Sequence, residues 1–302
     1  MNGVLKKLAL ATLALALGLS MGSALADDVL LKPFVLASRG AGTVADKAAA
    51  AKTALQANGF TIAGSYSPYP ETTIIVVTND EMKTTAAKSE HGGFGAAQRV
   101  SVTRVGDDVQ VSYTNPTYMA NGYRMAGDLP QTAEKLQAAL GKMEEFGARG
   151  LSASKLRKYH YMFGMEYFDE PSVLAEYGSY EEAAKAVEAN LAAGKGNCTK
   201  VYRVDVAGKK ESVFGVAMKG GDKYMDDKYI MSVIDFGDLK SSAHLPYEML
   251  VTGNKVIALY ARFRIALDFP DLKMAGANSF MKIMESPEAI KKALTQAAGG
   301  KE

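Results

Sequence analysis

The sequence predicts an α+β fold of two tandem two-layer α/β sandwich domains that are related by duplication. The length of 302 residues suits two domains of ordinary size better than one. A hydrophobic content of 48% supports a real core, and 23% charged residues argue against disorder. The two halves also repeat one order of elements: helix, strands, connecting segment, hairpin and helix.

The duplication is predicted from the hairpin of each half. The turn residue Gly106 aligns with Gly253, and Tyr113 in the returning strand aligns with Tyr260. Identity elsewhere is low, so two unrelated α+β units that share common elements are the alternative. The expected parts of the chain are a signal peptide at 1–26, a first domain at 27–150, a connecting segment at 151–178 and a second domain at 179–302.

Residues 1–26 have the pattern of a secretory signal peptide. Lys6 and Lys7 precede an apolar run, and the small-x-small sequence Ala24-Leu25-Ala26 offers a cleavage site. The run is too short to span a membrane. We therefore expect a periplasmic protein that is not a lipoprotein and keeps no membrane span after cleavage.

The charge balance argues against nucleic acid as a partner. The whole chain has a formal net charge of +2, and the leader contains two lysines and no acidic residue. The mature chain is therefore expected to be formally neutral, which gives no bulk attraction toward nucleic acid or anionic lipid.

In the first domain, capping and turn residues set the expected boundaries. A capping box of Thr78 and Glu81 opens one helix, and Gly59 ends another. Gly106 and Asp107 form a hairpin turn. Helices are expected at 46–58, 78–89 and 131–146, and strands at 29–37, 60–66, 72–77, 99–105 and 109–114.

The second domain shows similar signals. Ser179 and Glu182 form a second capping box, Gly253 and Asn254 a second hairpin turn, and Ser286 begins the closing helix. Helices are expected at 155–163, 180–193 and from 286 onward, and strands at 198–206, 211–218, 229–236, 247–251 and 255–265.

Three stretches of the first half share a recognisable pattern. Leu55–Phe60 ends a helix in Gly-Phe, Thr73–Asn79 is a strand that runs into an asparagine, and Val100–Pro116 is a hairpin that ends before a proline. In these motifs residues 45–120 resemble the bacterial domain of unknown function family 302, with a weaker repeat in the second half. The usual proline after the asparagine is Asp80 here. The resemblance implies a two-layer α+β fold, and it implies no chemistry because the family has no established catalytic residues.

One segment, residues 159–168, concentrates aromatic, histidine and methionine side chains. It supplies four candidate ligand-binding residues: His160, Met162, Met165 and Tyr167. Outside the cytoplasm, imidazole and thioether groups together suit copper or an axial haem position. The same pattern fits a core segment where the halves meet, with methionines filling irregular gaps. We expect the core segment, and therefore no metal and no cofactor.

His91 is a further candidate ligand-binding residue, because the flexible glycine loop Gly92–Gly95 follows it. Such a loop can act as a lid over a pocket, and a helix C-terminus closed by glycine is the alternative. The sequence has no zinc-binding spacing of histidines. Its only Gly-x-Ser-x-Gly pattern, residues 18–22, lies in the leader. We therefore assign no catalytic residue.

Arg262 and Arg264 complete the candidate set. Their alternation on one expected strand places both guanidinium groups on one face, where they can bind a carboxylate or phosphate. Cross-strand pairing with Glu248 is the alternative. The single cysteine, Cys198, excludes an internal disulfide. We expect it to be a small buried side chain that opens a strand, with a reactive thiol as the alternative.

The function expected from these patterns is non-enzymatic. We expect an exported periplasmic binding or interaction protein that holds a small molecule between its domains or contacts another envelope protein. The alternative is a periplasmic hydrolase or other enzyme with a dispersed site, in which His91 or His160 acts as a base.

Overall fold

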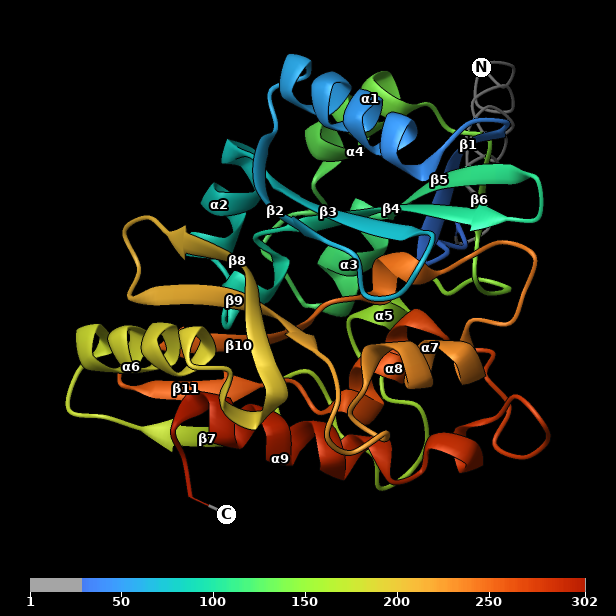
Figure 1. The fold of residues 1–302 in the computed structure, drawn as a ribbon. Helices are drawn as coiled ribbons and strands as arrows, with labels where there is room; N and C mark the ends of the chain where they lie inside the picture. Colours follow the sequence, from blue (N-terminus) through green and yellow to red (C-terminus); the bar gives the residue numbers. More distant parts are fainter. Residues whose placement is uncertain (1–28, 302) are drawn as a thin grey trace, which may run out of the picture.

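A computed structural model of the chain describes residues 29–301. The expected signal peptide therefore lies outside the described residues. The structure is a mixed α+β fold with two antiparallel sheets, as the sequence predicts, and Figure 1 shows the sheet of the first half above that of the second. No helix in the described part of the chain has the length and apolar character needed to cross a membrane.

The first half forms a six-stranded sheet with strand order β2-β3-β4-β5-β1-β6. Its elements in chain order are β1 (Phe34–Gly40), α1 (Val44–Ala57), β2 (Thr61–Tyr66), β3 (Thr72–Thr78), α2 (Asp80–Ala87), the 3-10 turn η1 (Gly92–Gly95), β4 (Gln98–Val105), β5 (Asp108–Thr114), α3 (Pro116–Gly122), α4 (Pro130–Leu140) and β6 (Glu144–Phe146).

The second half follows the short helix α5 (Ala153–Leu156) and forms a five-stranded sheet with order β7-β11-β10-β9-β8. Its elements are β7 (Ser172–Glu176), α6 (Tyr180–Ala192), η2 (Lys195–Asn197), β8 (Cys198–Val206), β9 (Glu211–Met218), α7 (Asp227–Ile234), η3 (Ser242–His244), β10 (Tyr247–Thr252), β11 (Lys255–Ala258), α8 (Ala261–Asp268), η4 (Phe280–Ile283) and α9 (Ser286–Ala298).

The two sheets have the same topology. The strand order β8-β9-β10-β11-β7 repeats the order β2-β3-β4-β5-β1. Helices α6, α7, α8 and α9 stand at the places in the second half that α1, α2, α3 and α4 occupy in the first. The tight hairpin turns occupy equivalent places, because Val105 pairs with Asp108 and Thr252 with Lys255. This agreement supports the predicted duplication. The strand β7, within the expected connecting segment, is the first strand of the second sheet.

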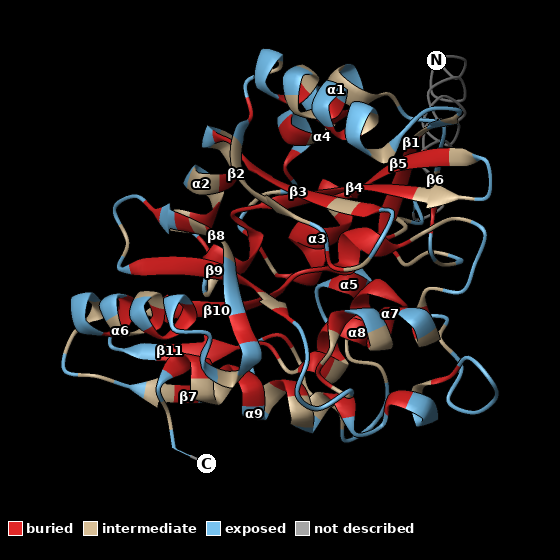
Figure 2. Ribbon diagram, viewed as in Figure 1, coloured by how far each residue is buried: buried red, intermediate tan, exposed pale blue. Residues whose placement is uncertain are grey.

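Each sheet turns one face toward its own helices and the other toward the opposite half. Helices α1 and α4 cover the outer face of the first sheet, and α6 and α9 contact the second sheet (Figure 1). Val100 and Val102 of β4 lie in the apolar core, whereas the alternate residues Ser101 and Thr103 are buried polar groups. The central strands of both sheets are buried while the outer surfaces of α1 and α6 are exposed (Figure 2).

The halves pack through reciprocal contacts that are approximately two-fold symmetric. η1 of the first half lies against β8, β9 and β10, and η3 of the second half lies against β3, β4 and β5. The equivalent edge strands β2 and β8 contact each other. Val204, Leu250 and Phe263 of the second half belong to the same apolar cluster as the core of the first. Residues of the second half therefore complete the core of the first, while most of the second half's buried apolar residues form a separate cluster.

The expected strand at 229–236 is wrong, because this segment is the helix α7. Asp226 caps the helix, and its Oδ1 accepts a hydrogen bond from the amide of Tyr229 at 3.1 Å. Ile230, Met231 and Ile234 are buried along one stripe. This spacing is helical, and it buries one face of α7.

Several expected boundaries also differ from the structure, among them the strand expected at 29–37, which is β1 at Phe34–Gly40. The strand at 255–265 ends at Ala258, and α8 follows; α8 is buried on nearly all sides, so its sequence shows no clear helical period. The helix at 131–146 ends at Leu140, because Gly141 takes a positive φ of 92°. The helix expected at 155–163 is confined to α5. Cys198 opens β8 as a free, buried cysteine, as expected.

Candidate functional site

The four candidates in segment 159–168 contact one another near α8. The Nδ1 atom of His160 lies 2.9 Å from the carbonyl oxygen of Met162, and the His160 ring centroid lies 4.4 Å from that of Tyr167. Met162 is 45% exposed. Met165 lines a space of only about 10 Å³. These residues are brought together, but of the four only Met165 lines this space, which is too small to hold a small molecule.

His91 lies apart from them in a left-handed conformation before η1, and its ring contacts Phe168 edge-on at 6.4 Å between centroids. Within residues 29–301, neither His91 nor His160 pairs with a carboxylate. A general base needs a partner that orients its ring, so neither histidine has the surroundings typical of catalysis.

The two arginines do not share a face, which corrects the sequence prediction. Both lie on the helix α8, where residues two apart point in nearly opposite directions. Arg262 is 39% exposed and pairs with Glu166, whereas Arg264 is 2% exposed and pairs with Glu248 at 3.1 Å. The pairing with Glu248 is the alternative that the sequence left open, although a helix rather than a strand supplies the arginine.

A buried histidine that sequence reasoning left unassigned does meet an acid. The Nδ1 atom of His244 lies 2.6 Å from Asp268 Oδ2, and its Nε2 atom lies 3.1 Å from the hydroxyl of Tyr247. Burial lowers the pKa of His244 and keeps the imidazole neutral at pH 7, against the opposing effect of Asp268. Asp268 is 24 residues away on another element, so no local sequence motif indicates the pair.

This pair belongs to a buried polar cluster between the sheets. Glu248 contacts Arg99 of the first half at 2.5 Å and Arg264 at 3.1 Å, and it accepts a hydrogen bond from Tyr202. Arg264 also donates to the carbonyl oxygens of His244 and Pro246. All these charged side chains are almost inaccessible to solvent. The cluster therefore joins the halves and offers no surface to a substrate.

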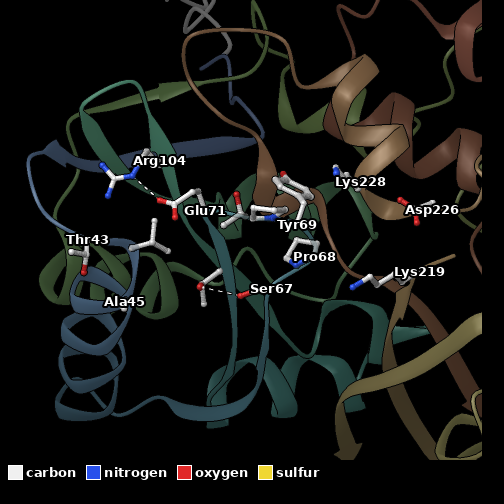
Figure 3. A pocket seen from close by; sticks show the side chains of 14 residues that line it. Thr43, Ala45, Ser67, Pro68, Tyr69, Glu71, Arg104, Lys219, Asp226 and Lys228 are labelled. Carbon is white, nitrogen blue, oxygen red and sulfur yellow. Dashed lines mark hydrogen bonds and ion pairs between the residues drawn. The ribbon is translucent and has the colours of Figure 1, made fainter.

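An open groove of about 780 Å³ lies where the first half meets the start of α7 (Figure 3). We call it the inter-half groove. Residues 67–73, which comprise the β2–β3 connection and the first two residues of β3, form its floor, and residues 43–45 at the start of α1 form one side. Lys219, Asp226 and Lys228 of the second half form the other. The groove is therefore built by segments far apart in the sequence.

The turn at the groove is held rigidly. Pro68 and Pro70 fix two backbone φ angles, and Glu71 takes a positive φ of 58°. The carboxylate of Glu71 accepts a hydrogen bond from Arg104 Nε at 2.7 Å. Such a turn keeps Tyr69 between the two halves.

The groove continues past Tyr69 into a second hollow of about 420 Å³. There the hydroxyl of Ser242 accepts hydrogen bonds from Tyr69 at 3.0 Å and Thr103 at 3.2 Å, and it donates to Asp235 at 3.2 Å. Burial raises the pKa of Asp235 to about 6, while the amide of Ser241 opposes the shift. This hydroxyl therefore links the groove floor of the first half to the second half.

The equivalent junction on the other side is held by direct contacts between the halves. There the turn between β8 and β9 meets η1 of the first half, and the carboxylate of Glu211 accepts a hydrogen bond from the amide of Gly93 at 3.1 Å. Lys209 pairs with Glu211 at 2.9 Å and donates to the carbonyl oxygen of Ser89. The junction at Tyr69 is an open groove, whereas Lys209 and Glu211 bridge the equivalent junction directly.

Comparison with protein-family models finds no match, and comparisons with curated proteins and with solved structures find none either. The resemblance of residues 45–120 to the domain of unknown function family 302 therefore stays a prediction. Between residues 29 and 301, no three histidine, cysteine, aspartate or glutamate side chains gather closely enough to hold a metal ion. Burial raises the pKa of the Cys198 thiol to about 12, so it is not activated as a nucleophile.

A buried acid beneath the groove should make stability depend on pH. The Oδ2 atom of Asp227 accepts hydrogen bonds from Tyr66 at 3.3 Å and from the amide of Met218 at 3.2 Å. Burial raises the pKa of Asp227 to about 8, Asp226 adds to this shift, and the two hydrogen bonds and Arg264 oppose it. The protonated acid therefore stabilises the fold most below about pH 4, and this stabilisation is lost as the pH rises through about 8.

We expect Asp227→Asn to remove this dependence. Relative to the wild type, the variant should gain stability by up to about 1.4 kcal/mol per pH unit between about pH 5 and 7. Urea unfolding across that range measures the difference. The exposed Asp107 in the β4–β5 turn supplies the control, Asp107→Asn, whose stability relative to the wild type should not change with pH. The assignment is contradicted if the stability of Asp227→Asn relative to the wild type does not change with pH either.

Proposed function

We propose that this chain is an exported binding protein that holds a small-molecule ligand in the inter-half groove without converting it. The observation that carries the proposal is the groove itself, about 780 Å³ with walls from both halves. Small-molecule sites occupy this size range and often lie where two units meet. Export rests on the signal-peptide pattern of residues 1–26.

The lining suits binding. Pro70, Tyr69 and Val44 offer apolar surface, and Thr73 and Ser67 offer hydroxyl groups. A few polar groups on an apolar surface are what fix a ligand's orientation. The residues that line the groove and its continuation include neither histidine nor cysteine. The two candidate bases, His91 and His160, belong to other surfaces.

The test combines ligand detection with a blocked groove. Native mass spectrometry of the protein purified from its own host, followed by a thermal-shift screen of small molecules, identifies a ligand. Ala45 is exposed on α1 and lines the groove, so Ala45→Trp should fill the groove without disturbing the core. We expect this variant to lose at least about 10-fold in affinity, because the new side chain occupies the ligand's volume.

Ala57→Trp is the matched control, since Ala57 is exposed at the far end of the same helix. It should bind like the wild type. The groove assignment is wrong if Ala45→Trp and Ala57→Trp bind equally well. A turnover that disappears in His91→Ala or His160→Ala would instead favour the dispersed enzyme.

A further inference from the structure

The inter-half groove carries lysines without an acidic partner. Lys219 lines the first hollow, Lys240 the second, and Lys228 lines both. Among residues 29–301, none of the three ammonium groups forms an ion pair with a carboxylate. Lys240 donates only to the neutral carbonyl oxygen of Asp235, at 3.0 Å. Lys219 and Lys228 are therefore available to a ligand, and so is Lys240, although its charge also acts on the neighbouring Asp235 carboxyl.

The carboxylates of the groove are already engaged elsewhere. Glu71 is paired with Arg104. Asp226 caps α7, and its other oxygen accepts from the amide of Gly220 at 2.9 Å. Asp235 accepts from the amide of Ser241 at 2.8 Å and from a hydroxyl. A carboxylate that is held by such hydrogen bonds is not free to move to a nearby lysine.

Other hollows do not share this excess of cations. The hollow beside Phe146 is lined by Asp235 and Asp271 and by no lysine or arginine. The hollow along α6 is lined by two acids and two bases, with Arg203 between 2.7 and 3.7 Å from its acidic partners. Within residues 29–301, Lys185 in the hollow along α6 also lacks an ion pair, but that hollow has one such lysine, whereas the groove and its continuation have three.

We propose that the ligand is a small organic anion with two or more carboxylates, recognised by Lys219, Lys228 and Lys240. This proposal rests on the proposed function, because it names the ligand class of the same groove. Two carboxylates are required because the lysines occur in both hollows, on either side of Tyr69. The body of the ligand lies on the apolar surface of Tyr69 and Pro70.

The experiment measures binding of a panel of di- and tricarboxylates, citrate among them, by thermal shift and isothermal titration calorimetry. Each acid is paired with its neutral methyl ester. We expect an acid to bind and its ester to fail. The affinity should fall several-fold between low and high salt, because exposed charges are screened. The combined variant Lys219→Gln, Lys228→Gln and Lys240→Gln should bind at least about 10-fold more weakly.

The control carries the same change in charge at three lysines outside the groove: Lys52→Gln, Lys158→Gln and Lys195→Gln. The affinity of this control should stay within about two-fold of the wild type, a difference too small to indicate a lost contact. Equal binding of acid and ester, or equal losses in both combined variants, overturns the anion proposal. If Ala45→Trp blocks a neutral ligand and no carboxylate binds, the groove function stands and only this inference fails. If no compound binds at all, both fail.

Discussion

Replacing Glu248 with alanine is expected to lower the free energy of unfolding by about 3–5 kcal/mol. Glu248 is 2% exposed, and its two oxygens meet the guanidinium groups of Arg99 and Arg264 at 2.5 and 3.1 Å. Alanine leaves both cations buried without their acid, and they cannot be hydrated there. Urea unfolding at neutral pH measures the loss from the midpoint and slope of the transition.

Glu176→Ala is the surface control. Glu176 pairs with Lys255 at 3.0 Å, and both side chains are about half exposed, at 56% and 49%. Breaking this pair should cost less than about 1 kcal/mol. Equal losses in the two variants would show that the buried cluster contributes no more than a surface ion pair.

Replacing Gly64 with alanine is expected to cost about 3 kcal/mol, because it forces the halves apart. A Cβ atom at this position of β2 would lie 2.2 Å from the carbonyl oxygen of Val201 in β8. The obstructing atom belongs to the backbone, so no side-chain rotation relieves the clash. Thermal or urea unfolding of the variant measures the cost.

Gly40 offers the matched control on β1. A Cβ atom there meets nothing within 4 Å, and its backbone φ is not positive. Gly40→Ala should therefore change the stability by less than about 0.5 kcal/mol. If Gly64→Ala were equally harmless, the close crossing of β2 and β8 would be wrong.

Local signals were enough to predict the fold class and most elements. The hairpins could be placed because Gly106 and Gly253 mark tight turns between alternating strands. The helix α7 was missed because the spacing of the apolar residues in Tyr229–Phe236 fits a strand as well as a helix. The one helical signal was the capping residue, Asp226. The helix α8 was missed because it is buried on nearly all sides, and its charged residues Arg264 and Asp268 lie in the buried polar cluster, so they do not mark a solvent-facing side.

The candidate site could not be predicted in the same way, because long-range contacts build it. The sequence predicts a break between the strands at 60–66 and 72–77, but not that Tyr69 in this break meets Ser242, a residue 173 positions away. The buried pair of His244 and Asp268 likewise joins two elements of different type. Side chains with a recognisable local pattern, such as those near His160, instead lie beside a space of only about 10 Å³.

The reciprocal packing of the halves bears on how such a chain could have arisen. A single-copy ancestor with this topology would present the same face to a second copy, and the two would form an isologous dimer. Symmetry would then make both junctions identical, open or closed together. Joining the copies in one polypeptide removes that constraint, because the two junctions can then differ in sequence. Lys209 and Glu211 can close one junction while the other, at Tyr69, changes independently.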